Sequence, residues 1–101
     1  MIVVRNVFQL KFGKAREATA LMKEGLAAQK KALAGVDYST RILADVTGAF
    51  YTLVLELSVP TLAAYEANVP KALGDPDFQA VYRKMAELVD SGHREIFTIV
   101  E

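Results

Sequence analysis

Apolar and polar residues alternate along the first segment of the chain. At residues 1–12 the even positions are apolar except for Asn6, whereas the odd positions mix apolar side chains with Arg5 and Gln9. A period of two sends these two sets to opposite faces of a strand. We therefore predict a strand whose even face lies under helices, with Asn6 as the only polar residue on that face.

In the next segments the spacing of the apolar residues along the chain changes. Residues 14–34 carry apolar side chains at the three-to-four spacing of a helix. Residues 38–45 and 49–57 flank the turn-rich residues 45–48, which predicts a hairpin of two strands. Neither face of residues 38–45 is uniformly apolar, so this strand has the weakest pattern of the set.

The second half of the chain is predicted to be helical over residues 61–91 and then to form a last strand at residues 94–101. The helix is broken near Pro70–Asp75, because proline cannot continue an unstrained helix interior. We expect a kink or break near Val69. Gly74 ends the first piece, and Asp75 then caps a second helix that has Pro76 at its first position.

The order of elements is therefore β-α-β-β-α-β, which is the order of the split βαβ, or ferredoxin-like, fold. We predict an α+β sandwich over residues 1–101 as one domain, with a four-stranded antiparallel sheet and helices on one of its faces. The other face of the sheet must then meet water, a ligand or a second copy of the chain.

The face away from the helices is predicted to be rich in apolar residues. It would carry Val3, Val7, Phe50, Val54, Ile96 and Val100, among the polar residues Arg5, Gln9, Thr52, Glu56, Arg94 and Thr98. Monomers rarely leave an apolar patch of roughly several hundred Å² open. We therefore predict a homodimer through this face, with Arg5, Arg94 and Glu56 in interface ion pairs. The alternative is an amphipathic face that a monomer tolerates.

Composition narrows the functional classes. The net charge is zero, so neither nucleic acid nor an anionic membrane is expected as a partner. With no cysteine and one histidine, the chain has no metal-ligand spacing and no thiolate chemistry. We expect no metal and no cofactor. There is no signal-peptide core and no apolar run of about 20 residues, so a cytoplasmic location is the default expectation.

Two segments resemble a known superfamily. VVRNVFQLKFGK at residues 3–14 resembles the opening strand of the dimeric α+β barrel proteins, with Phe12 where proline is common there. DPDFQ at residues 75–79 and LVDSGHREI at residues 88–96 resemble the NIPSNAP-like branch. The resemblance implies a homodimer whose two sheets pack together as a barrel. It also implies a pocket between sheet and helices in each subunit.

Asn6 is the sharpest candidate for chemistry, because a buried amide without partners is costly. It lies seven residues before Gly13. That spacing is similar to the asparagine of haem-degrading and some antibiotic-type monooxygenases in the superfamily, which faces the pocket and polarises oxygen or substrate. The alternative is a structural asparagine that bonds to the backbone. The haem-degrading relatives also use a helix-borne axial histidine and a tryptophan, which this chain does not match.

Aromatic residues and the only histidine supply further candidates. Tyr51 is predicted on the helix side of its strand, and His93 shares the parity of Phe97, so either could move a proton near Asn6. Phe8, Tyr65 and Tyr82 are predicted to line an apolar pocket. The alternatives are a surface role for His93 and core packing for the tyrosines.

Two functions stay open at this point. One is a NIPSNAP-like homodimer that binds a small apolar molecule between sheet and helices. The other is a cofactor-independent monooxygenase or isomerase acting on an aromatic or quinone-type compound, in which Asn6 polarises oxygen or substrate. An open, polar-lined cavity around Asn6 would favour the enzyme. A filled core with Asn6 bonded to the backbone would favour the binding protein.

Overall fold

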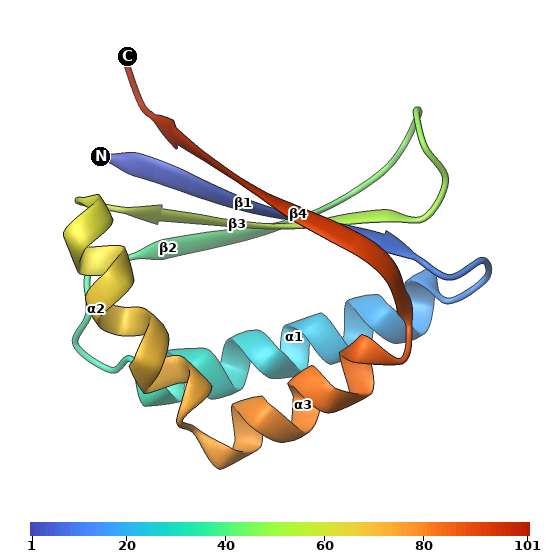
Figure 1. Ribbon diagram of the computed structural model, residues 1–101, viewed down its shortest axis with the longest axis horizontal. Helices are drawn as coiled ribbons and strands as arrows, with labels where there is room; N and C mark the ends of the chain where they lie inside the picture. Colours follow the sequence, from blue (N-terminus) through green and yellow to red (C-terminus); the bar gives the residue numbers. More distant parts are fainter.

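A computed structural model describes residues 1–101 as a four-stranded antiparallel sheet with three helices. The elements follow the order β1 (Ile2–Leu10), α1 (Ala15–Ala32), β2 (Ser39–Ala44), β3 (Thr52–Val59), α2 (Leu62–Leu73), α3 (Pro76–Ala86) and β4 (Val89–Thr98). The sheet forms one layer, α1 and α3 run side by side below it, and α2 lies toward one end (Figure 1). The predicted ferredoxin-like α+β fold is confirmed, with its helices on one face of the sheet.

The strands are arranged in the order β2-β3-β1-β4, which places β1 inside the sheet. Asn6 in the middle of β1 lies opposite Leu55 of β3 and opposite Arg94 of β4. Residues directly opposite each other on antiparallel strands share a face. The even residues of β1 face the helices, as predicted, and Val4 and Leu10 are buried there.

The packed core occupies one end of the space between sheet and helices. It consists of Leu10, Ala18, Met22, Leu53 and Leu88, which join β1, α1, β3 and the turn before β4. Leu53 is 1% exposed, so its contacts anchor the hairpin strand to this core. The opposite end of the same space contains the cavity described below.

The predicted break in the second helical half is confirmed, but it lies at Gly74 and Asp75 rather than near Val69. Helix α2 continues through Pro70, and the Gly74 N–H donates to the Pro70 carbonyl at 2.9 Å. Pro70 is exposed, so the hydrogen bond that it cannot make is lost on the solvent side of the helix. The Asp75 side chain then accepts from the Phe78 N–H at 2.9 Å and caps α3.

The boundaries of the last two elements differ from the prediction. Helix α3 ends at Ala86 rather than Ser91, and β4 begins at Val89. Gly92 lies within β4. A Cβ at Gly92 would come within 3.2 Å of the Phe8 ring, so glycine allows β4 to lie close against β1. The register shifts between Gln9 and Leu10, at the start of this pairing.

The face that each β4 residue occupies was predicted wrongly. Arg94 and Ile96 pair with Asn6 and Val4, so they point toward the helices and not away from them. The opposite set, which includes His93 and Phe97, lies on the open face. Neither set is uniformly apolar, so the alternation alone does not show which set faces the helices. The pairing of β4 with β1 determines it.

None of the helices has both the length and the apolar composition that crossing a membrane requires.

Replacing the cap of α3 tests its local energetics. Asp75→Ala should lower the free energy of unfolding by about 1 kcal/mol, because the first turn of α3 loses the acceptor for the Phe78 N–H. Asp75→Asn keeps an acceptor and should remain close to the wild type in urea denaturation. Equal unfolding free energies for the two variants would contradict the capping role.

Candidate functional site

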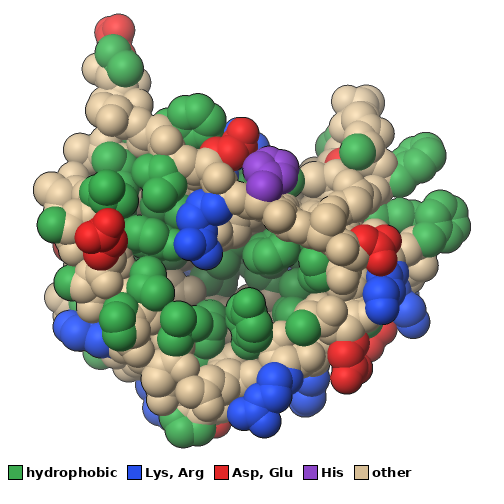
Figure 2. Space-filling view, in the orientation of Figure 1, with side chains coloured by type: hydrophobic (Ala, Val, Ile, Leu, Met, Phe, Trp, Pro, Cys, Tyr) green, Lys and Arg blue, Asp and Glu red, His purple; other side chains and the backbone are tan.

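A cavity of about 430 Å³ opens between the sheet and the helices. It is lined by 23 residues, of which 18 are hydrophobic, and they come from β1, β3, β4 and from every helix. Figure 2 shows the hollow in the middle of one side of the molecule, with hydrophobic side chains around it. The volume falls within the range of about 300–1,000 Å³ that is typical of small-molecule sites.

Few polar side chains reach this cavity. They are Asn6, Gln29, Asn68 and Arg94, together with the tyrosines Tyr38, Tyr65 and Tyr82. Arg94 is the only charged residue in the lining, and no Asp or Glu contributes to it. A mostly apolar wall with a few polar groups favours an apolar molecule that carries a small number of polar atoms.

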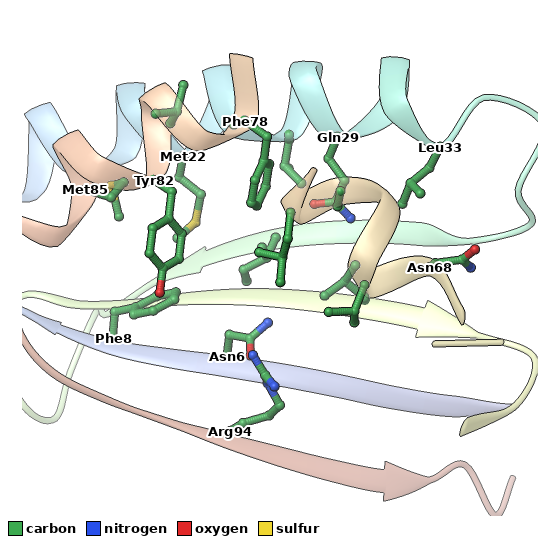
Figure 3. Close-up of a pocket in the computed structure, with 18 of the residues that line it drawn as sticks. Asn6, Phe8, Met22, Gln29, Leu33, Asn68, Phe78, Tyr82, Met85 and Arg94 are labelled. Carbon is green, nitrogen blue, oxygen red and sulfur yellow. The ribbon is translucent and has the colours of Figure 1, made fainter. Parts of the chain in front are cut away.

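Asn6 and Arg94 form one polar pair on the sheet side of the cavity. The Arg94 Nε–H donates to the Asn6 Oδ1 at 2.6 Å (Figure 3). Because arginine can only donate, the amide oxygen of Asn6 must face it, and the amide nitrogen is turned toward the cavity. The guanidinium carbon of Arg94 also lies 5.9 Å from the centre of the Tyr65 ring, which comes from α2.

Gln29 lies on the opposite wall, in α1. It is only 7% exposed, its side-chain amide makes no hydrogen bond within the protein, and Figure 3 shows the amide pointing from the helix into the cavity. Tyr38 also lines the cavity, and its hydroxyl is buried without a partner. Burial raises the pKa of Tyr38 above its ordinary value, so this hydroxyl stays protonated at neutral pH.

The structure brings together four of the predicted site residues. Asn6, Phe8, Tyr65 and Tyr82 all line the cavity, with Phe8 on the sheet and Tyr82 on α3 (Figure 3). The placement of these side chains follows from the even face of β1 and from the apolar stripes of α2 and α3.

Tyr51 and His93 do not join this group. Tyr51 lies in the turn before β3 with a φ of 58°, and its ring packs edge-on against Phe12 with the ring centres 4.8 Å apart. His93 pairs with Val7 on the open face of the sheet, so the prediction that it faces the helices is wrong. Neither residue lines the cavity near Asn6.

Most of the lining was not predicted, and this includes four polar or charged residues, Gln29, Tyr38, Asn68 and Arg94. Gln29 lies on the apolar stripe of α1, four residues before Leu33 and three after Leu26, so it breaks an apolar face just as Asn6 does. That signal could have identified it. Arg94 was assigned to the wrong face, and Tyr38 was treated as part of a strand with no uniform pattern.

The open face of the sheet carries a row of charges across all four strands. In order across the sheet, the row consists of Arg41, Glu56, Arg5 and Glu95, which are paired in register. Glu56 is 9% exposed, and its carboxylate accepts from the Arg41 Nε–H at 3.0 Å and lies 3.5 Å from the Arg5 Nε. Arg5 also lies 3.9 Å from Glu95. Opposite charges alternate along the row, so these groups neutralise one another within the chain.

Of the other residues predicted for the dimer face, Val3, Val7, Gln9, Thr52 and Val54 lie on this side, whereas Ile96 and Thr98 share the helix-facing side with Arg94. Val7 pairs with the buried Val54, and the Gln9 side chain donates to the backbone carbonyl of Phe50. Phe50 itself lies in the turn before β3 and is 75% exposed. Phe97, which was predicted on the other side, adds a half-exposed ring to this face.

No group of three or more His, Cys, Asp or Glu side chains is placed to hold a metal ion.

Neither the known family profiles nor the curated proteins include a match to this sequence. Solved structures do share its fold. An uncharacterised NIPSNAP domain protein from Burkholderia xenovorans has a TM-score of 0.85 at 16% identity, over 99% of this chain and 95% of that one. A NIPSNAP family protein from Agrobacterium tumefaciens has a TM-score of 0.85 at 20% identity, over 99% and 93% of the two chains.

A structure of an antibiotic biosynthesis monooxygenase is also similar, with a TM-score of 0.75 at 13% identity over 100% of both chains. These identities are low, so the likeness is one of fold. The fold that the resemblance implied is confirmed: the chain has the architecture of NIPSNAP domain proteins and of antibiotic biosynthesis monooxygenases.

Proposed function

We propose that this protein binds a small apolar molecule in the cavity between its sheet and its helices. The observation that carries the proposal is the cavity itself, which is about 430 Å³ in volume and mostly hydrophobic in its lining. A ligand that removes an apolar wall of this extent from water lowers the free energy of the complex. The aromatic side chains Phe8, Phe78, Tyr65 and Tyr82 offer ring faces and edges to an aromatic or alicyclic body.

Filling the cavity tests the binding function. Ala72 lines it from α2 and is 8% exposed, whereas Ala67 lies on the same helix and is exposed. We expect the neutral fluorescent probe N-phenylnaphthylamine to bind the wild type and Ala67→Phe, and to bind Ala72→Phe about tenfold more weakly or not at all, because the new ring occupies the site.

Thermal melting followed by circular dichroism shows whether both variants remain folded. A folded Ala72→Phe variant that binds the probe as tightly as Ala67→Phe would contradict the cavity as the binding site. So would a wild type that does not bind the probe.

The open sheet face supports a second part of the proposal, a homodimer. Val3, Val7 and Phe97 share this face with the charge row of Arg41, Glu56, Arg5 and Glu95. The row is already paired within one chain, so a second copy can cover the face without leaving a charge unpaired. The barrel-like pairing of sheets that the resemblance implies would bury this same surface.

Light scattering at micromolar concentration tests the dimer. We expect about twice the chain mass of 11.1 kDa for the wild type and for Val46→Glu, whose site in the β2–β3 turn is 95% exposed. Val7→Glu should give the monomer mass, because it places an unpaired carboxylate in the covered face. A wild-type monomer would refute the dimer, and a dimeric, folded Val7→Glu variant would place the interface elsewhere.

One observation favours an enzymatic function as the second candidate. The cavity around Asn6 is open, and Asn6 is bonded to the Arg94 side chain instead of to the backbone. The amide nitrogen is therefore free to polarise oxygen or a substrate carbonyl. In a monooxygenase of this kind, an activated ring methylene and O₂ would give a ring carbonyl and water. Tyr51 and His93 lie outside the cavity. The proton would therefore have to be transferred by the hydroxyl of a tyrosine that lines the cavity, or by the substrate itself.

Oxygen uptake tests this second candidate. With anthrone as substrate, an Asn6-dependent monooxygenase should consume O₂ at a rate that falls by about 10²-fold in Asn6→Ala, because a preorganised donor is lost. Gln9→Ala removes an amide from the other face and should keep the wild-type rate. Uptake that is absent, or equal in all three proteins, would contradict the enzymatic role of Asn6.

A further inference from the structure

We propose that the cavity selects apolar molecules that carry a carboxylate, and that Arg94 together with Asn6 holds this head group. The inference rests on the proposed binding function and specifies the chemistry of its ligand. It assigns Arg94 as the determinant of specificity and the hydrophobic lining as the site of the apolar body.

The lining of the cavity carries one positive charge and no negative charge. Arg94 is the only ionised side chain among the residues around the cavity, and no Asp or Glu lies among them. The other two arginines of the sheet, Arg5 and Arg41, both pair with Glu56 on the opposite face. Of these three arginines, Arg94 alone has no carboxylate partner in the structure. An arginine beside an apolar cavity is stabilised when an anion joins it there.

The hydrogen bond between Arg94 and Asn6 determines which donors of the pair remain free. The Nε–H of Arg94 is used by the Asn6 Oδ1 at 2.6 Å, which leaves the two terminal guanidinium nitrogens without a partner. The same bond turns the Asn6 amide nitrogen, which can only donate, toward the cavity. The pair therefore presents donors and no acceptor. A carboxylate, which only accepts, fits this arrangement better than an amide or an alcohol.

Side chains from two other elements hold the Arg94 guanidinium in place. Asn6 fixes the guanidinium from β1, and the Tyr65 ring lies 5.9 Å from the guanidinium carbon on the α2 side. Arg94 is itself exposed, so it lies at the rim of the cavity, where a charged group keeps contact with water. A ligand can then leave its head group at the rim and place its body against Phe8 and Met85, which line the same cavity and are less exposed than Arg94.

Two ligands of nearly equal shape separate the contribution of charge to the binding affinity from that of the apolar body. Naphthoate and its neutral amide, naphthamide, can each be titrated against bound N-phenylnaphthylamine and by calorimetry. We expect the wild type to bind naphthoate about tenfold more tightly than naphthamide, as a charged hydrogen bond implies. Because Arg94 is exposed, raising the salt concentration to about 0.5 M should narrow the preference.

The variant Arg94→Gln should lose most of the preference. It keeps a donor for Asn6 but removes the charge, so naphthoate should bind about tenfold more weakly while naphthamide changes by less than about twofold. Arg83→Gln removes a positive charge from the exposed surface of α3, outside the cavity, and should change neither affinity. Circular dichroism shows whether both variants are folded.

The outcomes separate the two levels of the proposal. If the wild type binds naphthoate and naphthamide equally, the binding function stands and the carboxylate preference is wrong. If the preference survives in Arg94→Gln, the head group is held elsewhere and the inference about Arg94 is wrong. If neither naphthalene compound nor N-phenylnaphthylamine binds, the binding function fails and the inference fails with it.

Discussion

The pairing of β4 with β1 decides which side chains reach the cavity. Arg94 faces the helices because it lies opposite Asn6, and His93 faces away because it lies opposite Val7. A shift of one residue would exchange these two side chains between the faces of the sheet. Gly92 helps to fix the register, because its missing side chain leaves room for the Phe8 ring. The candidate binding chemistry therefore depends on this one strand pairing.

The space between sheet and helices is divided into a packed end and an open end. The packed end contains Leu10, Leu53 and Leu88 and holds the hairpin to α1. At the open end, α3 approaches α1 so closely that a Cβ at Gly25 would lie 3.3 Å from the Val81 side chain. Lys31 of α1 also binds Asp77 of α3 at 3.1 Å. The two helices thus support each other on the side of the cavity that faces the sheet.

Sequence periodicity predicted the fold because two patterns are clear in this chain. They are the period-two alternation of β1 and the three-to-four spacing of apolar residues in α1. The single polar residue on the even face of β1 also led directly to the cavity. The sequence pattern could not show which face of the sheet each β4 residue occupies, because neither of the two alternating sets of β4 is clearly apolar. The register of such a strand comes from its partner, through contacts that no local pattern records. Arg94 was placed on the wrong face for this reason, and its hydrogen bond to Asn6 could not be foreseen.

The side-chain amides of the chain provide the most direct test of the central claim, that a ligand enters the space between sheet and helices. Asn6, Gln29 and Asn68 line the cavity, whereas Gln9 lies on the opposite face and Gln79 bonds to the Leu73 carbonyl on the surface. In an NMR titration with naphthoate, the amide resonances of Asn6 and Gln29 should shift while those of Gln9 and Gln79 stay in place. A shift at Gln9 without one at Asn6 or Gln29 would place the ligand on the other face and contradict the account.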